Sequence, residues 1–545
     1  MKFFQDQTEA KIRGSYYTPL GIASYLAEWV ISRSAKRILE PSCGDGAFIE
    51  ALAKLSKSEI HLDGFEIDRV EAAKAKQKLE NASLMSGSIE ATDFLSWYND
   101  SSHFVEQYDA VVGNPPFVRY QYLSEKQQEN TRKIFEKSSL PFTLHTNLWV
   151  PFVIASSRLL KPGGLLALVI PSEIIHVLHA SALRSFLLSS YSKVLLLDPE
   201  SLLFPSALQG AMLLIAEKKA PGQSSKGISI QAQLPLSFFN KPIECYIKES
   251  LYRQPTFENL KWTEFLLSDE EISIYHEINN HLWVKKFGDI AKADVGIVTG
   301  ANDFFLVSDD IVKEYGLQKR SLPMFGRSDH VKGLIYDRKA HESNKKAGLP
   351  ANFIYFSEEL ERLSEREKSY IKLGEMEGLH LRYKCRIRSP WYKVPSIFST
   401  KVGMLKRSHE TPRLIFNDFD ALSTDTSYRI KTEIDPATFV YSFVNSLTSL
   451  SAELEGRHYG GGVLELVPSE IEQLKIPLID KKNKTDLLAL HRKYTSRKTR
   501  INEIVLSQDK VTLLPYLKSK RKIDSIQNAW LRLQSRRMRK PMSAV

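Results

Sequence analysis

The chain of 545 residues is 43% hydrophobic and 26% charged, which is ordinary for a globular protein, and its length predicts two or three domains. No apolar run reaches the roughly 18 residues of a membrane span, and the first residues lack the apolar stretch of a signal peptide. Three widely spaced cysteines indicate neither a disulfide framework nor a metal site, so we expect a cytoplasmic protein with no membrane or metal partner.

The net charge of +11 is concentrated in one part of the sequence. Residues 481–545 contain 18 Lys and Arg against 4 Asp and Glu, a balance of +14, whereas residues 1–240 contain 24 of each kind. The basic residues cluster at 518–522 and 536–540. Such a stretch is either a solvated, mobile segment or a surface for phosphate groups.

A strand followed by a rigid polar turn occupies residues 108–120, which read Tyr-Asp-Ala-Val-Val-Gly-Asn-Pro-Pro-Phe-Val-Arg-Tyr. The β-branched run before Gly113 predicts a buried strand that ends at a turn. Because the prolines donate no N–H, the Asn114 amide oxygen and the Pro115 carbonyl can together accept both hydrogens of an exocyclic amino group. Phe117 can stack on the ring that carries this group. Besides a plain strand and turn, the stretch therefore fits a device that holds a nucleobase or an amide.

Upstream, the sequence predicts the start of a doubly wound α/β domain. Thr18 and Pro19 suit the N-cap and the first position of a helix. A short strand at 37–40 is followed by a glycine loop at 41–46 and then by a second helix. Strand, glycine loop and helix form the phosphate- or nucleoside-binding start of such domains, although a simple tight turn has the same pattern.

Acidic residues near the ends of later strands fit a single nucleoside. Glu66 ends the strand predicted from residue 60, where its carboxylate can accept both hydroxyls of a ribose. Further on, Asp93 can accept a hydrogen bond from an adenine amino group, with Phe94 beside the ring. The sequence has neither the full glycine fingerprint of a dinucleotide site nor a phosphate-loop lysine, so a dinucleotide or a nucleoside triphosphate fits less well.

These motifs resemble, in their order, those of S-adenosylmethionine-dependent adenine-N6 DNA methyltransferases. The resemblance rests on Glu-Pro-Ser-Cys-Gly-Asp-Gly from residue 40, Gly-Phe-Glu-Ile-Asp from 64, Thr-Asp-Phe-Leu from 92 and Asn-Pro-Pro-Phe from 114. More narrowly, residues 14–120 resemble the gamma class of restriction–modification systems, the TaqI type, in which a Thr-Pro segment comes first and a target recognition domain comes last. Phe117 departs from the commoner tyrosine, but the change keeps the stacking face.

The resemblance implies a role for each matched residue, with S-adenosylmethionine as cofactor. The residues implied to hold its methionine and ribose parts are Thr18, Glu40, Gly44 and Glu66, and those implied to hold its adenine are Asp93 and Phe94. Asn114, Pro115 and Phe117 would grip the target base. Phe204 lies in a loop between strands predicted at 194–198 and 211–215, and it would stack on the flipped adenine from the other side or else fill the core.

The rest of the chain is expected to recognise the target. A small polar stretch at 218–226 predicts a linker, which gives a catalytic domain at 1–225, a mixed α+β recognition domain at 226–480 and a basic helical segment at 481–545. Helices are expected at 488–506 and 523–533 in this last segment.

Three stretches of the second half stand out, at 294–303, 383–392 and 456–463. The second combines basic residues with aromatic ones, and the third combines arginine and tyrosine with a glycine run, which suits contact with phosphates and bases. The candidate DNA-binding residues are Lys384, Arg386, Arg388 and Arg457. All three stretches resemble segments in the C-terminal domains of the same methyltransferases.

The sequence therefore predicts an enzyme that methylates a flipped-out adenine in double-stranded DNA at a specific site. It would act as a monomer and protect that site from a cognate restriction endonuclease, without direct contact between the two proteins. An RNA or protein-glutamine methyltransferase could use the same Asn-Pro-Pro-Phe site. A combined restriction–modification enzyme is disfavoured because no nuclease domain fits before Gly14, and a degenerate DNA-binding module because Asn114, Glu66 and Asp93 are intact.

Overall fold

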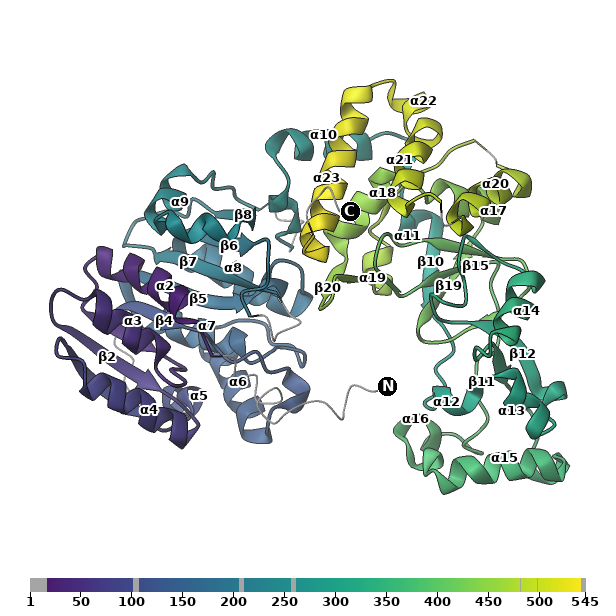
Figure 1. The fold of residues 1–545 in the computed structure, drawn as a ribbon, viewed down its shortest axis with the longest axis horizontal. Coiled ribbons are helices and arrows are strands. Elements are labelled where there is room, and N and C mark those ends of the chain that lie inside the picture. Colours follow the sequence, from purple (N-terminus) through teal and green to yellow (C-terminus); the bar gives the residue numbers. More distant parts are fainter. Residues whose placement is uncertain are drawn as a thin grey trace. The chain divides into compact units, whose positions relative to one another are not determined.

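The computed structural model describes residues 17–100, 107–204, 210–255, 261–480, 482–496 and 498–540. The chain divides into two compact units, 1–267 and 268–545, here called the first and the second unit. Figure 1 shows a large sheet with helices on both sides in the first unit, and several smaller sheets among helices in the second. Gly14, where the resemblance begins, lies outside the described residues.

The first unit is built on an eight-stranded sheet with the order β3-β2-β1-β4-β5-β7-β6-β8. Its strands are β1 (Arg37–Glu40), β2 (Ile60–Phe65), β3 (Met85–Glu90), β4 (Tyr108–Gly113), β5 (Leu160–Pro171), β6 (Tyr191–Pro199), β7 (Ala211–Lys218) and β8 (Ile228–Leu234). Only β7 runs antiparallel to its neighbours, β5 and β6. The doubly wound α/β class expected from the sequence is confirmed.

Helices cover both faces of this sheet, which explains the continuous apolar run of β4. They are α2 (Leu20–Ser32), α3 (Ala47–Leu55), α4 (Arg69–Glu80), α5 (Phe94–Asp100), α6 (Glu125–Lys137), α7 (Trp149–Leu159), α8 (Ser181–Ser190) and α9 (Ile243–Glu249). Ala110, Val111 and Val112 are all fully buried, although successive side chains of a strand point to opposite faces. A strand buried on both faces carries apolar residues without alternation.

The boundaries of this unit differ from two expectations. β8 pairs in parallel with β6 directly after the polar stretch at 218–226, so the first unit extends beyond the boundary expected at residue 225, to residue 267. At the other end, α2 begins at Leu20 with Pro19 as its N-cap, one residue later than expected, and Thr18 precedes the cap. The Pro19 carbonyl accepts the N–H of Ile22.

The second unit is the mixed α+β part expected from the sequence. Its main sheets are β10-β19-β15-β17-β13, β11-β14-β12-β18 and β16-β21-β20, with β22 paired to β9. The strands are β9 (Val284–Lys286), β10 (Ala291–Val295), β11 (Leu306–Val307), β12 (Ser321–Phe325), β13 (Ile335–Tyr336), β14 (Asn352–Ile354), β15 (Val402–Leu405), β16 (Arg407–Ser408), β17 (Leu414–Asn417), β18 (Leu422–Ser423), β19 (Ser427–Thr432), β20 (Arg457–Tyr459), β21 (Val463–Glu465) and β22 (Lys475–Pro477).

Helices surround these sheets, and the C-terminal ones belong to the same unit. They are α10 (Asp269–Asn279), α11 (Phe287–Ile290), α12 (Asn302–Phe305), α13 (Asp309–Glu314), α14 (Arg338–Lys346), α15 (Glu365–Met376), α16 (Tyr383–Arg386), α17 (Pro436–Ser442), α18 (Ser446–Glu455), α19 (Pro468–Ile471), α20 (Lys484–Thr495), α21 (Ile501–Thr512), α22 (Leu514–Leu517) and α23 (Lys520–Met538). Within the described ranges, no helix is both long and apolar enough to cross a membrane.

The expected helix at 488–506 is in fact two helices, α20 and α21. The connecting sequence, Ser-Arg-Lys-Thr-Arg at 496–500, contains no apolar residue that a continuous helix could bury. The second expected helix, at 523–533, lies within the longer α23. Together these helices pack into the second unit and do not form a separate segment.

An ion pair buried inside the second unit holds α23 against α18. The Arg537 side chain is 0% exposed, and its Nε and Nη2 donate to the Glu453 carboxylate at 2.9 and 2.7 Å. The same guanidinium donates to the main-chain carbonyls of His409 (2.8 Å) and Glu410 (3.2 Å). Arg537 belongs to the basic cluster at 536–540, so this member of the cluster serves the fold and is not available to phosphates.

Replacing Arg537 by Met should destabilise the protein by about 3–5 kcal/mol, because it leaves the Glu453 charge buried without its counterion. Urea unfolding measures the change. Arg521→Met is the matched control, since the Arg521–Glu270 pair is exposed and should contribute less than about 1 kcal/mol. Equal stability of the two variants would contradict the assigned role of Arg537.

A half-buried histidine fixes α20 to the second unit. His491 Nδ1 accepts the main-chain N–H groups of Leu334 (3.0 Å) and Ile335 (3.1 Å), at the start of β13. Burial lowers the pKa of His491, and Arg413 lowers it further, although Asp337 opposes the shift. An imidazole that accepts two bonds at Nδ1 has to keep that nitrogen unprotonated.

This arrangement predicts a stability that is lost in acid. The folded state binds a proton at His491 less readily than the unfolded state, so the stabilisation is complete above the unfolded pKa of about 6.5 and declines below it, by up to about 1.4 kcal/mol per pH unit. His491→Gln should flatten the dependence of the thermal midpoint on pH between neutral and mildly acidic solution. His145→Gln, at an exposed histidine of the first unit, is the control and should keep the wild-type pH dependence.

Candidate active site

The carboxyl ends of three adjacent strands bring the predicted site residues to one edge of the sheet. β1 lies between β2 and β4 and is parallel to both, so Glu40, Glu66 and Asn114 all leave the sheet at this edge. Ser42 Oγ donates a hydrogen bond of 3.1 Å to the main-chain carbonyl of Asn114. This bond joins the glycine loop after β1 to the Asn-Pro-Pro-Phe loop after β4.

The glycine loop is held in place by Glu66. One carboxylate oxygen accepts the N–H of Gly44 at 2.9 Å and the other accepts the N–H of Asp68 at 2.9 Å. Gly46 has a φ of 86°, and a Cβ there would lie 3.1 Å from the Cα of Ala75. The position therefore requires glycine, both for the left-handed backbone and for the close approach of α4.

Glu40 is a buried carboxyl group at the centre of this edge. The residue is 1% exposed, and in the described part of the chain its Oε2 has no hydrogen-bond partner. Burial raises the pKa of Glu40 well above its usual range, and the nearby negative charges of Glu66 and Asp45 raise it further. A cationic ligand group would relieve both effects, because it supplies the missing partner and offsets the negative charge.

This chemistry fits S-adenosylmethionine. Its ammonium and sulfonium groups are positive, which suits the cluster of Glu40, Glu66 and Asp45. Its carboxylate is negative, which suits the N-terminus of α3. The residues present at the edge thus match both charges of the methionine part.

The predicted adenine contacts, Asp93 and Phe94, also serve the fold. The Asp93 carboxylate accepts Ser96 Oγ at 2.8 Å and the N–H of Ser96 at 3.2 Å at the start of α5. Phe94 is 1% exposed and lies 5.4 Å from Phe65 and 5.5 Å from Phe152, measured between ring centroids. Contrary to expectation, the structure makes Phe94 a core residue with no ring face open to a ligand, because this aromatic cluster anchors α5.

The Asn-Pro-Pro-Phe loop is half-buried at the end of β4. Pro115 is buried, and Phe117 packs against the main core cluster of the first unit. Phe204 belongs to the same cluster and is 5% exposed. The structure thus brings Phe117 and Phe204 into one apolar cluster, but a base can stack on Phe204 only if the residues around it move.

The hydrogen-bonded network beside this loop was not predicted from the sequence. Glu173, two residues after the end of β5, accepts Asn147 Nδ2 at 2.8 Å and Trp149 Nε1 at 3.0 Å. Burial alone would raise the pKa of Glu173, but its hydrogen bonds with His179, Asn147 and Trp149 lower it to about 2. The carboxylate is therefore ionised at neutral pH.

This network adjoins the loop through the main chain. The N–H of Leu148, which lies between two partners of Glu173, donates to the Val118 carbonyl at 2.9 Å. Val118 directly follows Phe117, so the network fixes the far end of the Asn-Pro-Pro-Phe loop. The sequence does contain one signal for this network, because the acidic residue Glu173 follows the strand end at Pro171 and Ser172.

The predicted DNA-binding residues of the second unit differ in their environment. Arg388 donates to the carbonyls of Val298 (2.6 Å) and Thr299 (2.7 Å), and Arg457 pairs with the buried Glu470 at 2.9 Å. Both are engaged with their own chain. The two exposed residues are Lys384 and Arg386.

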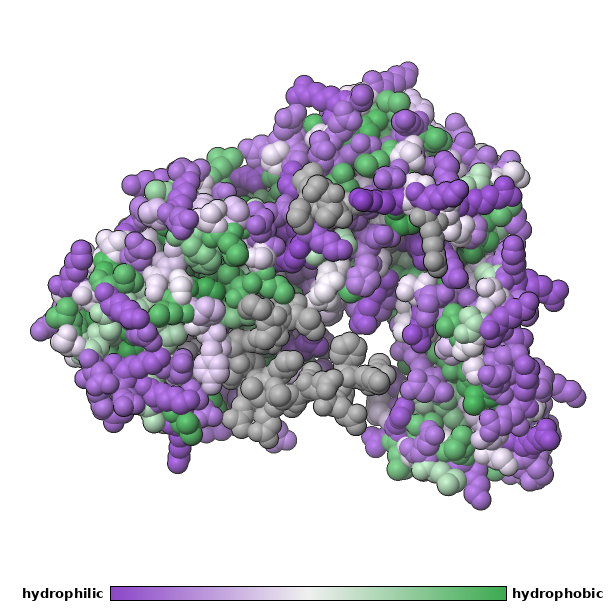
Figure 2. Space-filling model, in the orientation of Figure 1, coloured by the Kyte–Doolittle hydropathy of each residue, from purple (hydrophilic) through white to green (hydrophobic). Residues whose placement is uncertain are grey.

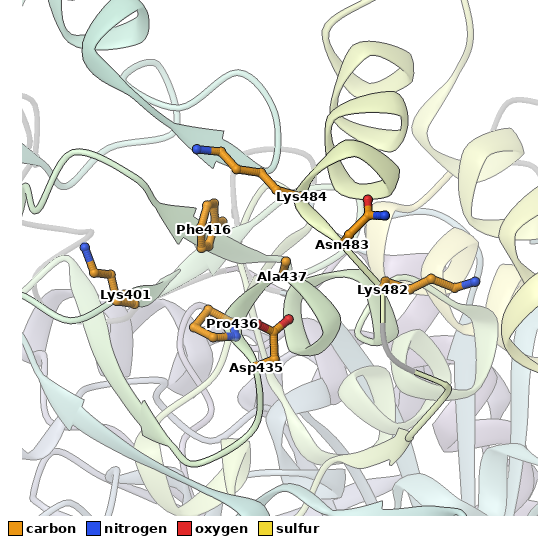
Figure 3. A pocket seen from close by; sticks show the side chains of 8 residues that line it. All are labelled: Lys401, Phe416, Asp435, Pro436, Ala437, Lys482, Asn483 and Lys484. Atoms are coloured by element: carbon orange, nitrogen blue, oxygen red, sulfur yellow. The ribbon is translucent and has the colours of Figure 1, made fainter.

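A surface pocket of about 430 Å³ also lies in the second unit. Figure 3 shows its lining residues, which are Lys401, Phe416, Asp435, Pro436, Ala437, Lys482, Asn483 and Lys484. Lys401 pairs with Asp420 and Lys484 with Asp418, at 2.7 and 2.6 Å. None of the predicted site residues lines this pocket, so it is separate from the candidate active site.

Two family models match the chain. Residues 48–201 match the Eco57I restriction-modification methylase model. Residues 259–513 match the model of the C-terminal domain of type II methyltransferase M.Eco57I. The first match lies in the first unit, which carries the candidate active site at the carboxyl ends of β1, β2 and β4, here called the strand-edge site. The second match covers most of the second unit.

Individual proteins agree with these models. The type II methyltransferase M.AccI of Acinetobacter calcoaceticus is 25% identical, over 88% of this chain and 88% of its own length. M.BanIII of Aneurinibacillus aneurinilyticus is 23% identical, over 59% of this chain and 63% of its own length. The chain therefore spans nearly all of one curated relative and less than two thirds of the other.

Solved structures share the fold. The restriction–modification enzyme MmeI, in complex with DNA, has a TM-score of 0.57 and 12% identity, with 97% of this chain and 77% of that chain covered. A nuclease-deletion mutant of LlaGI, with a DNA substrate mimic, has a TM-score of 0.50 and 13% identity, with 88% of this chain and 47% of that chain covered. Family models, relatives and the strand-edge site together show that the chain belongs to the Eco57I-type methyltransferases of type II restriction–modification systems, with S-adenosylmethionine as its cofactor.

Proposed function

We propose that the chain is a site-specific DNA methyltransferase that transfers a methyl group from S-adenosylmethionine to the N6 atom of an adenine in double-stranded DNA. The observation that carries the proposal is the Asn-Pro-Pro-Phe loop at the end of β4, joined to the glycine loop through Ser42 and Asn114. The match of the second unit to the M.Eco57I C-terminal domain favours DNA over RNA or a protein glutamine as substrate. The biological role would be protection of the site from a cognate restriction endonuclease, with the enzyme acting as a monomer.

The chain's own residues would activate the amino group by hydrogen bonding. The lone pair of an adenine amino nitrogen is delocalised into the ring, which makes it a weak nucleophile. Two acceptors, the Asn114 amide oxygen and the Pro115 carbonyl, would bind the two amino hydrogens and favour a pyramidal nitrogen. The cofactor supplies an electrophilic methyl group, so catalysis consists of positioning and electrostatic stabilisation, and no separate base is needed before transfer.

The base has to leave the helix to reach this edge of the sheet. Phe117 would stack on one face of the flipped adenine. This contact offsets part of the free energy that unstacking the base costs, which is about a few kcal/mol. Phe204 would stack on the other face once the core around it opens. The ionised Glu173 would keep the loop in place during this movement.

Asn114→Ala should lower the rate of methyl transfer at least about a hundredfold, because one of the two acceptors is lost. Incorporation of labelled methyl groups into plasmid DNA measures the rate, and isothermal titration calorimetry should show that the variant still binds S-adenosylmethionine. The control is Asn81→Ala, the same replacement at an exposed position of the first unit. Full activity of the Asn114 variant would refute the assignment.

Glu40→Gln should weaken the binding of S-adenosylmethionine about tenfold or more, since it replaces a charge-assisted contact to the ammonium group by a neutral one. Calorimetric titration of the variant gives the dissociation constant. Glu50→Gln is the control, because Glu50 is a partly exposed acid in α3 that pairs with Lys54. Unchanged affinity of the Glu40 variant would show that this carboxyl group does not contact the cofactor.

A further inference from the structure

An outward-facing segment of the second unit combines exposed apolar residues with cations. It runs from Leu379 through the short helix α16 to Arg388, and we call it the α16 clip. Leu379 and Cys385 are buried and fix the segment to the core beneath. Leu381, Tyr383 and Ile387 point the other way and are among the most exposed large apolar residues of the described chain, with Tyr383 62% exposed.

The clip is held in place by residues 298–300, which belong to the stretch at 294–303 that stood out in the sequence. Arg388 donates to the carbonyls of Val298 and Thr299, and a Cβ at Gly300 would lie 2.7 Å from the Cβ of Lys384. Such close contact leaves the loop at 298–300 little freedom against α16. The outward side chains are therefore presented from a fixed base.

Two cations flank the exposed aromatic ring. Lys384 Nζ lies 5.4 Å and Arg386 Cζ 5.7 Å from the centre of the Tyr383 ring. Arg382 is exposed next to them. Among the residues that the structure describes, none of these three cations forms an ion pair, whereas Lys401, Arg407 and Lys484 of the same unit pair with carboxylates.

Exposed apolar side chains of this size cost free energy on a surface that contacts only water. Figure 2 shows hydrophobic atoms at the surface where Figure 1 places α16, with hydrophilic residues around them. Apolar side chains that protrude between unpaired cations match a partner with dense negative charge and an apolar interior. Duplex DNA has both, since its phosphates line grooves whose sugars and base steps are apolar.

We propose that the α16 clip is a DNA contact in which Tyr383 packs as an apolar wedge in a groove while Lys384 and Arg386 bind the flanking phosphates. This inference rests on the proposed function and refines it. It assigns the apolar part of the contact to Tyr383, which the basic pattern alone did not indicate. It also removes Arg388 from the set of phosphate contacts, because that guanidinium holds the loop at 298–300.

Binding of a fluorescently labelled duplex of mixed sequence, measured by anisotropy over a series of salt concentrations, tests the clip. For Lys384→Ala/Arg386→Ala, the slope of log K against log salt should become shallower by about 2, since each phosphate contact contributes about 0.9. For Tyr383→Ala, affinity should fall about tenfold with an unchanged slope, whereas Tyr383→Phe should bind like the wild type. Arg366→Ala/Lys372→Ala removes the same charge from exposed positions of α15 and should keep the wild-type slope.

The side chains concerned are exposed, so circular dichroism and the thermal midpoint should be unchanged in every variant. The inference is overturned if the Tyr383 and double variants bind the duplex with wild-type affinity and slope. It is also overturned if the double variant loses binding only to anionic phosphatidylserine vesicles, which would assign the clip to a lipid surface. A wild-type chain that methylates DNA although its clip variants bind normally refutes the clip alone, whereas a wild-type chain that neither binds nor methylates DNA refutes the proposed function as well.

Discussion

The parallel pairing of β1 with β2 and β4 is the constraint on which the active site depends. Because these strands run in one direction, their following loops meet at a single edge, and residues far apart in sequence become neighbours. Glu66 then does two tasks with one carboxylate, since it holds the glycine loop through Gly44 and begins the turn toward α4 through Asp68. Ser42 extends the same connection to Asn114. A shift of one strand would separate all of these groups.

Much of the first unit could be predicted because its signals are local. Short apolar strands, a glycine loop and a proline-rich turn each report their own structure, and their order gives the doubly wound fold. The structural roles of Asp93 and Phe94 could not be distinguished from ligand binding in this way, because the same residue type can cap a helix, fill a core or contact a ligand. Only the packing of Phe94 against Phe65 shows its place. The role of Glu173 could not be predicted, because its hydrogen-bond partners Asn147 and Trp149 belong to a different part of the sequence.

The second unit was harder to predict for a physical reason. Its strands are short and its sheets combine segments from distant parts of the sequence, so periodicity within one segment carries little information. Charge was also misleading there. Arg457 and Arg537 have the same charge as Lys384 and Arg386, yet the first two neutralise buried carboxylates and the others face solvent. A count of basic residues cannot distinguish these environments, because it contains no information about partners.

The pair formed by Arg537 and Glu453 also bears on how the chain matures. The two residues are 84 positions apart, so during synthesis Glu453 emerges from the ribosome well before its counterion. Until then α18 cannot be enclosed without a heavy electrostatic cost, whereas the first unit already has every strand of its sheet. The first unit can therefore fold while translation continues, and the second closes late. A nascent enzyme would thus be able to form its cofactor site before it has a finished surface for recognising a target.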